Sequence, residues 1–273
     1  MMSTDEIMRL ALQMSGFRTV PPDSAIYVKG KGIRRILFGI DAGVPEILLA
    51  QKMRCDAVIS HHPQGGTAIL NFHKMFERHT ELMVEAGVPR KEAEQAVQKK
   101  RDALGVENHS RNYDHNVSVA RLLKMPYMNI HAPLDEIGRQ RMTEQVKLAT
   151  EKDPKATVGD IVTSLHKLSE FRNALTPVKI RLGKPSNKAG KVVVSHAAGT
   201  NGGYEVAKTF FKYGVGTLTY IHISSADLEH LRADGMENLI VTGHISSDSV
   251  GINPFLAELK KKKISVIRIG LVS

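Results

Sequence analysis

Three short motifs in the sequence place imidazoles and carboxylates directly after apolar runs. The first is the adjacent pair His61 and His62, which follows the run at residues 56–60. Neighbouring side chains in a strand point to opposite faces, but at a strand end the chain turns, so both imidazoles can reach one cleft. Neutral imidazoles are typical ligands of Zn, Fe, Mn, Co and Ni rather than of Ca or Mg. The pair is therefore a candidate metal-binding motif. The alternative is a strand end that carries two exposed histidines.

The second motif is His131-Ala-Pro-Leu-Asp135, which follows the apolar run at 126–130. Pro133 disfavours an uninterrupted helix from residue 131 but is tolerated in the first turn of the helix that follows. Asp135 would then lie near the start of that helix, where it could bridge two cations or act only as a first-turn acid. His131 could be a ligand or a partner that orients one.

The third motif is Gly243-His244-Ile-Ser-Ser-Asp248, after the run at 239–243. Residues four apart share one helical face, so His244 and Asp248 could turn an imidazole and a carboxylate toward one ion. The alternative is a capped helix with a solvated polar face.

Together the motifs supply three imidazoles and two carboxylates. That exceeds the four ligands of a structural zinc site and fits two divalent ions that share a bridging carboxylate and keep positions open for water. The predicted ligands are His61, His62, Asp135, His244 and Asp248. Such a pair of ions lowers the pKa of a bridging water and polarises a substrate oxygen. His131 or Asp41 could then transfer protons, histidine more readily because of its ordinary pKa.

Other polar clusters are weaker candidates. His109, Asp114 and His115 lie in a polar segment that follows no strand, where a lid or substrate-contacting role is favoured over a metal role. Gly199–Gly203 could cradle a phosphate at a helix N-terminus, but its spacing matches neither a P-loop nor a dinucleotide fingerprint and favours a tight turn. Ser195-His196 has no acid placed to complete a triad. Four further histidines are expected to be structural or on the surface: His73, His79, His166 and His230.

The elements that must position these motifs alternate between strands and helices. Strands are predicted at 35–40, 56–60, 126–130, 177–182, 191–195, 217–223, 239–243 and 264–269. Helices are predicted from Ser3 to Gly16, from Pro45 to about Met53, from Pro89 to Gly105 within a mostly helical stretch at 67–124, and at 136–151, 157–168, 204–213, 225–233 and 246–262. This alternation predicts an α/β fold with largely parallel sheets flanked by helices, in which ligands bind at the carboxyl ends of the strands.

Composition sets wider limits. The 273 residues allow one large or two small domains. The single cysteine, Cys55, excludes an internal disulfide and a thiolate-rich zinc site, and it opens an apolar run in which it should be buried. The net charge of +10 permits attraction to nucleic acid. However, the dense run Lys260–Lys263 ends a predicted helix and has no interleaved aromatic residues, so no nucleic-acid motif supports that partner.

The sequence also predicts where the protein acts. No apolar stretch approaches the roughly 18 residues that a membrane span needs. The acidic start, Met-Met-Ser-Thr-Asp-Glu, lacks the apolar segment of a signal peptide. We therefore expect a cytoplasmic protein without a membrane partner.

The three motifs, in this order along the chain, resemble those of the Nif-three-like dinuclear metal-binding family. They are Ser60-His61-His62-Pro63, the motif at 131–135, and Gly243-His244 with its carboxylate four residues later. Its members are often labelled GTP cyclohydrolase I type 2-like. The strand that ends at Asp41 and residues 175–203 also resemble the openings of the family's two lobes. The resemblance implies a metal site between two α/β lobes, the ligand set given above, and a hexameric ring. The lobes would comprise residues 1–152 completed by 238–273, and residues 153–237.

Three features depart from the family pattern. Asp248 stands where the family has Glu, a side chain one methylene longer. The stretch around 73–123 contains extra helix, and 219–224 lacks the family's acidic, histidine-rich run. The favoured interpretation is a metal-dependent hydrolase of a nucleotide or phosphorylated small molecule, because a basic protein attracts small anionic substrates. The alternative is a non-catalytic, metal-binding or regulatory oligomer.

Overall fold

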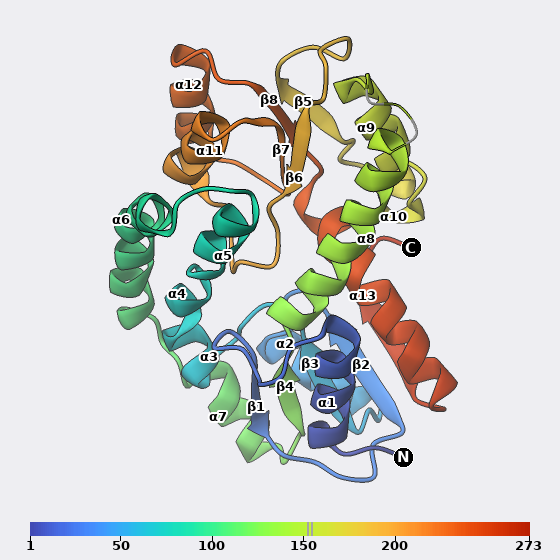
Figure 1. Cartoon of the computed structure of the whole chain (residues 1–273). Helices are drawn as coiled ribbons and strands as arrows, with labels where there is room; N and C mark the ends of the chain where they lie inside the picture. Colours follow the sequence, from blue (N-terminus) through green and yellow to red (C-terminus); the bar gives the residue numbers. More distant parts are fainter. Residues whose placement is uncertain (152, 154) are drawn as a thin grey trace. The chain divides into compact units, whose positions relative to one another are not determined.

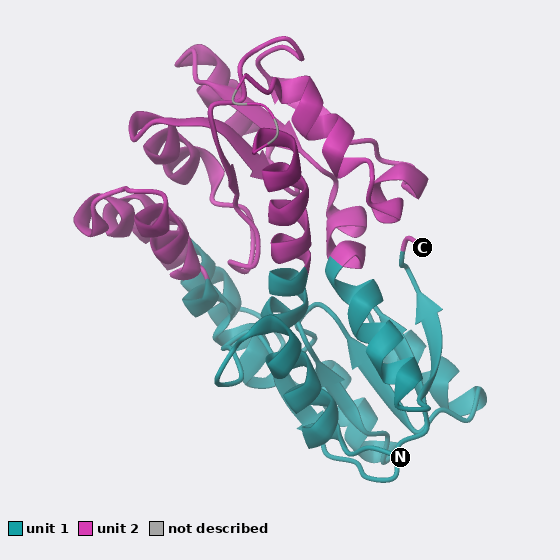
Figure 2. Cartoon of the chain, turned by 45° about the vertical axis from the view of Figure 1, so that its right-hand side comes forward, with its two compact units in different colours: residues 1–75, 103–137, 251–271 teal, residues 76–102, 138–250, 272–273 magenta. Residues whose placement is uncertain are grey.

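The computed structural model describes residues 1–151, 153 and 155–273 (Figure 1). The chain forms two compact units, coloured separately in Figure 2. Unit 1 comprises residues 1–75, 103–137 and 251–271, and unit 2 comprises residues 76–102, 138–250 and 272–273. The lobe boundaries expected from the sequence lie at other positions, and the one at residue 152 falls outside the described residues. That division into lobes stays a prediction.

The sheet of unit 1 has the strand order β1-β4-β3-β2-β9. Its strands are β1 (Ala25–Val28), β2 (Arg35–Gly39), β3 (Ala57–Ser60), β4 (Tyr127–Asn129) and β9 (Ser265–Ile269). All neighbouring pairs are parallel except β1 with β4. The strand β9 returns to this sheet from the end of the chain, as the resemblance implied. The edge strand β1 was not predicted, because it is a short, evenly half-buried segment without a clear alternation of polar and apolar residues.

Alternation along β2 separates the two faces of this sheet. Ile36 and Phe38 face one core and Leu37 faces the other, as expected for a period of two. The helices around these cores are α1 (Thr4–Ser15), α2 (Val44–Lys52), α7 (His115–Leu122), α8 (Ala132–Thr150) and α13 (His244–Lys261). Residues of α1, α8 and α13 pack in the first core, and residues of α2 and α7 pack in the second, which also contains the buried thiol of Cys55.

The sheet of unit 2 has the order β5-β8-β7-β6. Its strands are β5 (Lys179–Leu182), β6 (Lys191–Val194), β7 (Val215–Tyr220) and β8 (Asn238–Val241), with only the β5–β8 pair antiparallel among those described. One core contains residues of α8, α9 (Val158–Leu165) and α10 (Ser169–Asn173), while α11 (Gly203–Lys212) packs on β7 and on α12 (Ser225–Ala233). The strand β8, which the expected lobe boundaries assign to the first lobe, pairs with β5 and β7 in the sheet of unit 2.

The stretch between the histidine pair and β4 is mostly helical, as predicted. It contains α3 (Gly66–Leu70), α4 (Phe72–Met75), α5 (Arg78–Glu85), α6 (Arg90–His109) and α7. The expectation that Gly105 ends a helix is wrong, because α6 continues to His109. Gly105 does not adopt the left-handed conformation that ends a helix, and a glycine inside a helix costs only about 1 kcal/mol relative to alanine.

The fold class is therefore α/β, with two mostly parallel sheets flanked by helices. In the described part of the chain, no helix combines the length and the apolar character needed to cross a membrane.

Candidate metal centre

The histidine pair lies at the carboxyl end of β3. The backbone N–H of His61 donates to the carbonyl of Gly39 at 2.8 Å, and that of His62 donates to Ile40 at 2.9 Å. These bonds extend the parallel ladder beyond β3 and hold both residues at the sheet edge. His61 is fully buried, whereas His62 is partly exposed. The position predicted from the sequence is confirmed.

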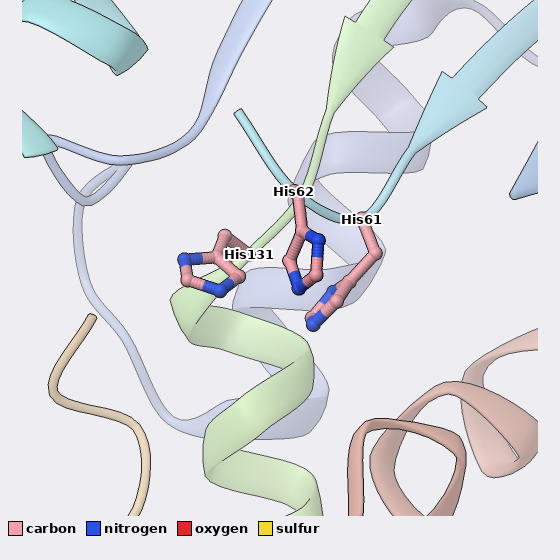
Figure 3. Close-up of side chains that lie close together, drawn as sticks. All are labelled: His61, His62 and His131. Atoms are coloured by element: carbon pink, nitrogen blue, oxygen red, sulfur yellow. The ribbon is translucent and has the colours of Figure 1, made fainter. Parts of the chain in front are cut away.

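Three imidazoles of unit 1 gather at this edge. Figure 3 shows the rings of His61, His62 and His131 where β3 and β4 end and α8 begins. Ring centroids are 5.1 Å apart for His61 and His62, and 4.8 Å for His61 and His131. One nitrogen from each of the three rings lies within 4.8 Å of the others. The sequence left His131 open between ligand and partner, and the structure makes it a member of a group that could hold a metal ion.

Each of these imidazoles has its Nδ1 beside an oxygen that acts as an acceptor. The pairs are His61 with the Ile130 carbonyl at 3.0 Å, His62 with Asp41 Oδ1 at 2.8 Å, and His131 with Asp23 Oδ2 at 2.8 Å. A carbonyl or carboxylate oxygen only accepts hydrogen bonds, so each Nδ1 must carry the proton. The lone pair of each neutral ring is then on Nε2, the arrangement typical of metal-binding histidines.

Asp135 lies among these rings from the first turn of α8. Its Oδ1 is 3.1 Å from Nε2 of His61, and its Oδ2 is 3.6 Å from Nε2 of His131. The two carboxylate oxygens therefore face two different imidazoles. Burial acts to lower the pKa of His131, but the charges of Asp135 and Asp23 outweigh it and raise that pKa.

His244 and Asp248 lie in the first turns of α13, within unit 2. Nε2 of His244 is 3.5 Å from Oδ2 of Asp248, so the spacing of four brings them together as predicted. The helix begins at His244, two residues earlier than expected. Gly243 precedes it with φ of 97°, and a Cβ there would lie 2.8 Å from Oγ of Ser246. Glycine is therefore required at the turn that presents His244.

A further histidine, His222, was not identified from the sequence, although it lies two residues after β7, as His62 lies two residues after β3. Its ring centroid is 4.8 Å from that of His244. Burial, assisted by the charge of His244, lowers the pKa of His222 to about 4. Nδ2 of Asn201 lies 2.9 Å from its Nδ1. The signal that could have found it is the general one, a polar residue directly after a buried strand.

The weaker sequence candidates have other contacts. The groups that could hold a metal among the described residues do not include His109, Asp114 or His115. Oγ of Ser195 lies 3.3 Å from Nδ1 of His79, a buried residue whose Nε2–H donates to the Thr200 carbonyl at 2.8 Å. In the glycine loop, Oδ1 of Asn201 accepts from the N–H of Gly203 and from Nζ of Lys100, so the loop is closed by its own side chain and by α6. These contacts favour the structural interpretation of the loop.

The fold and the clusters define an α/β protein with His and Asp groups that could hold a metal ion. A solved NIF3 superfamily protein from Sphaerobacter thermophilus is similar to this chain with a TM-score of 0.97 and 46% identity over 98% of both chains. Reduced HcgD from Methanocaldococcus jannaschii matches with a TM-score of 0.58 and 12% identity, over 98% of this chain and 97% of that one. A Bacillus cereus protein related to NIF3 matches with a TM-score of 0.52 and 11% identity, over 99% of this chain and 97% of that one.

The chain belongs to the NIF3 superfamily, as the Nif-three-like motifs implied. The two more distant structures show the fold alone. No family model and no curated protein matches the sequence.

Proposed function

We propose that this protein binds two divalent ions and acts as a metal-dependent hydrolase of a nucleotide or another phosphorylated small molecule. The proposed ligands are His61, His62, Asp135, His244 and Asp248. The ions would be Zn, Fe, Mn, Co or Ni, which imidazole and carboxylate donors favour. Bound there, they would supply Lewis acidity that polarises a substrate oxygen and activates water.

The observation that carries the proposal is the placement of Asp135. Its two oxygens face the Nε2 atoms of His61 and His131, and each of these rings has its proton held on Nδ1 by an oxygen. A carboxylate 3% exposed is costly to bury unless a cation or several donors compensate its charge. Nitrogen lone pairs and carboxylate oxygens brought together in this way suit divalent ions, with Asp135 as the bridge.

The pair on α13 supports the remaining ligands. Asp248 is buried, and its Oδ2 faces Nε2 of His244. Asp is shorter than the Glu of the family pattern, so we propose that Asp248 binds a single ion through one oxygen.

His131 and Asp41 were the candidates for proton transfer. Asp41 accepts from Nδ1 of His62, so we propose that it orients this imidazole. His131 is held by Asp23 and faces Asp135, which suits either a ligand or a proton donor. The substitution His131→Gln separates the two roles, since a ligand is needed for metal content and a proton donor only for turnover.

The test is metal analysis of the purified protein, followed by assays of nucleotides and phosphate esters with each metal. Two ions per chain and metal-dependent hydrolysis are expected. The double variant His61→Ala with His62→Ala should lose the ions and keep its circular dichroism spectrum. One ion or none in a fully loaded sample would refute the two-ion site. Two ions without any turnover would instead support the non-catalytic, regulatory alternative.

The resemblance also implied a ring, and we propose a hexamer. Size-exclusion chromatography with light scattering should give a mass six times that of one chain. A monomer under the same conditions would contradict the proposed hexamer.

A further inference from the structure

Unit 1 contains a pocket of about 570 Å³ directly beside the histidine pair. Its lining includes His62, Asp41, Gln64, Arg111, Asn112 and Asn116. The pocket is therefore lined both by the proposed metal ligand His62 and by residues of the polar segment at 107–115, for which the sequence favoured a lid or substrate-contacting role.

Specific contacts build this pocket. The N–H of Gly66 donates to the Tyr113 carbonyl at 2.7 Å, and Nδ2 of Asn116 donates to the Gln64 carbonyl at 3.1 Å. A Cβ at Gly65 would lie 2.6 Å from the Tyr113 oxygen, so only glycine permits this approach. The loop after the histidine pair is therefore held against the polar segment by the backbone itself.

The amide side chains of the lining are turned so that they offer donors. Oδ1 of Asn112 accepts from the N–H groups of Asp114 and His115, both at 3.2 Å. Oε1 of Gln64 accepts from Nδ2 of Asn116 at 3.2 Å. Since the oxygens are engaged in these bonds, the groups that Asn112 and Gln64 can offer a ligand are their NH₂ ends.

Charge points to the same kind of ligand. Arg111 brings a guanidinium with five N–H donors to the lining, and its ion-pair partner Glu107, four residues earlier in α6, is not among the lining residues. The lining carboxylate, Asp41, accepts the Nδ1 proton of His62. Beside this carboxylate, which is engaged by His62, the pocket holds a cation and two amide NH₂ groups, a set that matches the oxygens of a phosphoryl group.

We propose that this pocket binds the phosphate of a phosphate monoester, with Arg111, Asn112 and Gln64 as its donors. The assignment deepens the proposed function, because it places the anionic end of the substrate beside His62. Phosphate recognition itself requires no metal, since none of these three donors is a proposed ligand of the ions.

The experiment titrates the protein, as purified and after chelator treatment, with inorganic phosphate and with ribose 5-phosphate. Calorimetry should show that both bind, the ester more tightly, with and without metal. Arg111→Gln should weaken binding of both by at least about tenfold, as expected for the loss of a charged hydrogen bond. Asn112→Asp keeps the oxygen that caps the backbone but replaces the NH₂ donor with a negative charge, and it should weaken binding similarly.

Arg90→Gln is the matched control, because Arg90 also forms an exposed pair with a Glu one turn away, Glu94, but does not line the pocket. Equal weakening by Arg90→Gln and Arg111→Gln would show general attraction to a basic surface and overturn the proposal. Unchanged binding in both pocket variants would overturn it as well. Phosphate binding in a protein that holds no ions would leave this inference standing and refute only the metal site.

Discussion

The three clustered imidazoles of unit 1 and the imidazole of His222 in unit 2 differ in the groups that contact their Nδ1 atoms. In unit 1, the Nδ1 atoms of His61, His62 and His131 face oxygen acceptors. In unit 2, Nδ1 of His222 faces Nδ2 of Asn201, the nitrogen of an amide. Although all these residues follow strand ends, their neighbours give them opposite protonation patterns.

The orientation of Asn201 follows from its other contacts. Its Oδ1 lies 2.9 Å from the N–H of Gly203 and 3.2 Å from Nζ of Lys100, and both of these groups can only donate. Its Nδ2 must therefore donate to His222, which leaves the proton of the neutral ring on Nε2. The rings of unit 1 offer a lone pair, and His222 offers an N–H. The difference teaches that a histidine's partner, more than its place in the sequence, decides whether it can bind a metal.

The largest expected effect tests the bridge in unit 1. Asp135→Asn should abolish the binding of both ions, because it removes the negative charge of the carboxylate that is proposed to contact both of them. Asp248→Asn should mainly weaken one ion. Calorimetric metal titration measures both. Loss of both ions in Asp248→Asn, with none lost in Asp135→Asn, would show that the bridge is assigned to the wrong residue.

The next largest effect concerns the oxygens that accept the Nδ1 protons of the clustered histidines. Asp23→Asn, which can turn an NH₂ group toward Nδ1 of His131, should weaken metal affinity by about 10- to 100-fold, the usual consequence of losing such a partner. Asp114→Asn, an exposed acid outside the cluster, serves as the control. Equal affinities for wild type and Asp23→Asn would contradict the role given to this acceptor.

A single substitution should give His222 the protonation pattern of the clustered histidines in unit 1. Asn201→Asp replaces the donor beside His222 with an acceptor, so the ring proton should move from Nε2 to Nδ1. Nitrogen NMR of the imidazole distinguishes the two tautomers. The same chemical shifts in wild type and variant would mean that Asn201 does not control this ring. His222→Gln, for its part, should leave the metal content unchanged.

The smallest effect concerns stability. Burial lowers the pKa of His79 to about 3, against an ordinary value of 6.5. Between these values the unfolded chain takes up a proton that the folded chain excludes, so stability falls as pH falls through this range. The slope can reach about 1.4 kcal/mol per pH unit. Urea unfolding at pH 6.5 and 4.5 should therefore show a steeper loss for wild type than for His79→Gln, and parallel losses would refute it.

Local patterns in the sequence predicted much of the fold. Helices α1 and α9 each begin with a capping box, formed by Ser3 with Glu6 and by Thr157 with Asp160, as their cap residues predict. Buried runs ending in polar residues marked β2, β3 and β4. Since the ends of parallel strands meet at one edge, the motifs at His61 and Asp135 could be placed together in advance.

Contacts between distant segments were not predictable in this way. The acceptor of His131 is Asp23, 108 residues earlier, and the partner of Asn201 is Lys100 on a helix that departs from the family pattern. Neither pairing leaves a periodic signal. The strand β1 was missed for a related reason, because its register is set by pairing with β4 rather than by its own composition.

The burial of Cys55 has a practical consequence for chemical labelling. Burial raises the pKa of this thiol, and the side chain packs in the core beside α2, so little reactive thiolate is available near neutral pH. It is the sole cysteine of the sequence. A cysteine introduced at His115, an exposed residue that lines the pocket but is not one of the proposed phosphate donors, would therefore be the preferred target of a thiol-directed probe. Fluorescent or spin labels could then report ligand arrival beside His62 in an otherwise native chain.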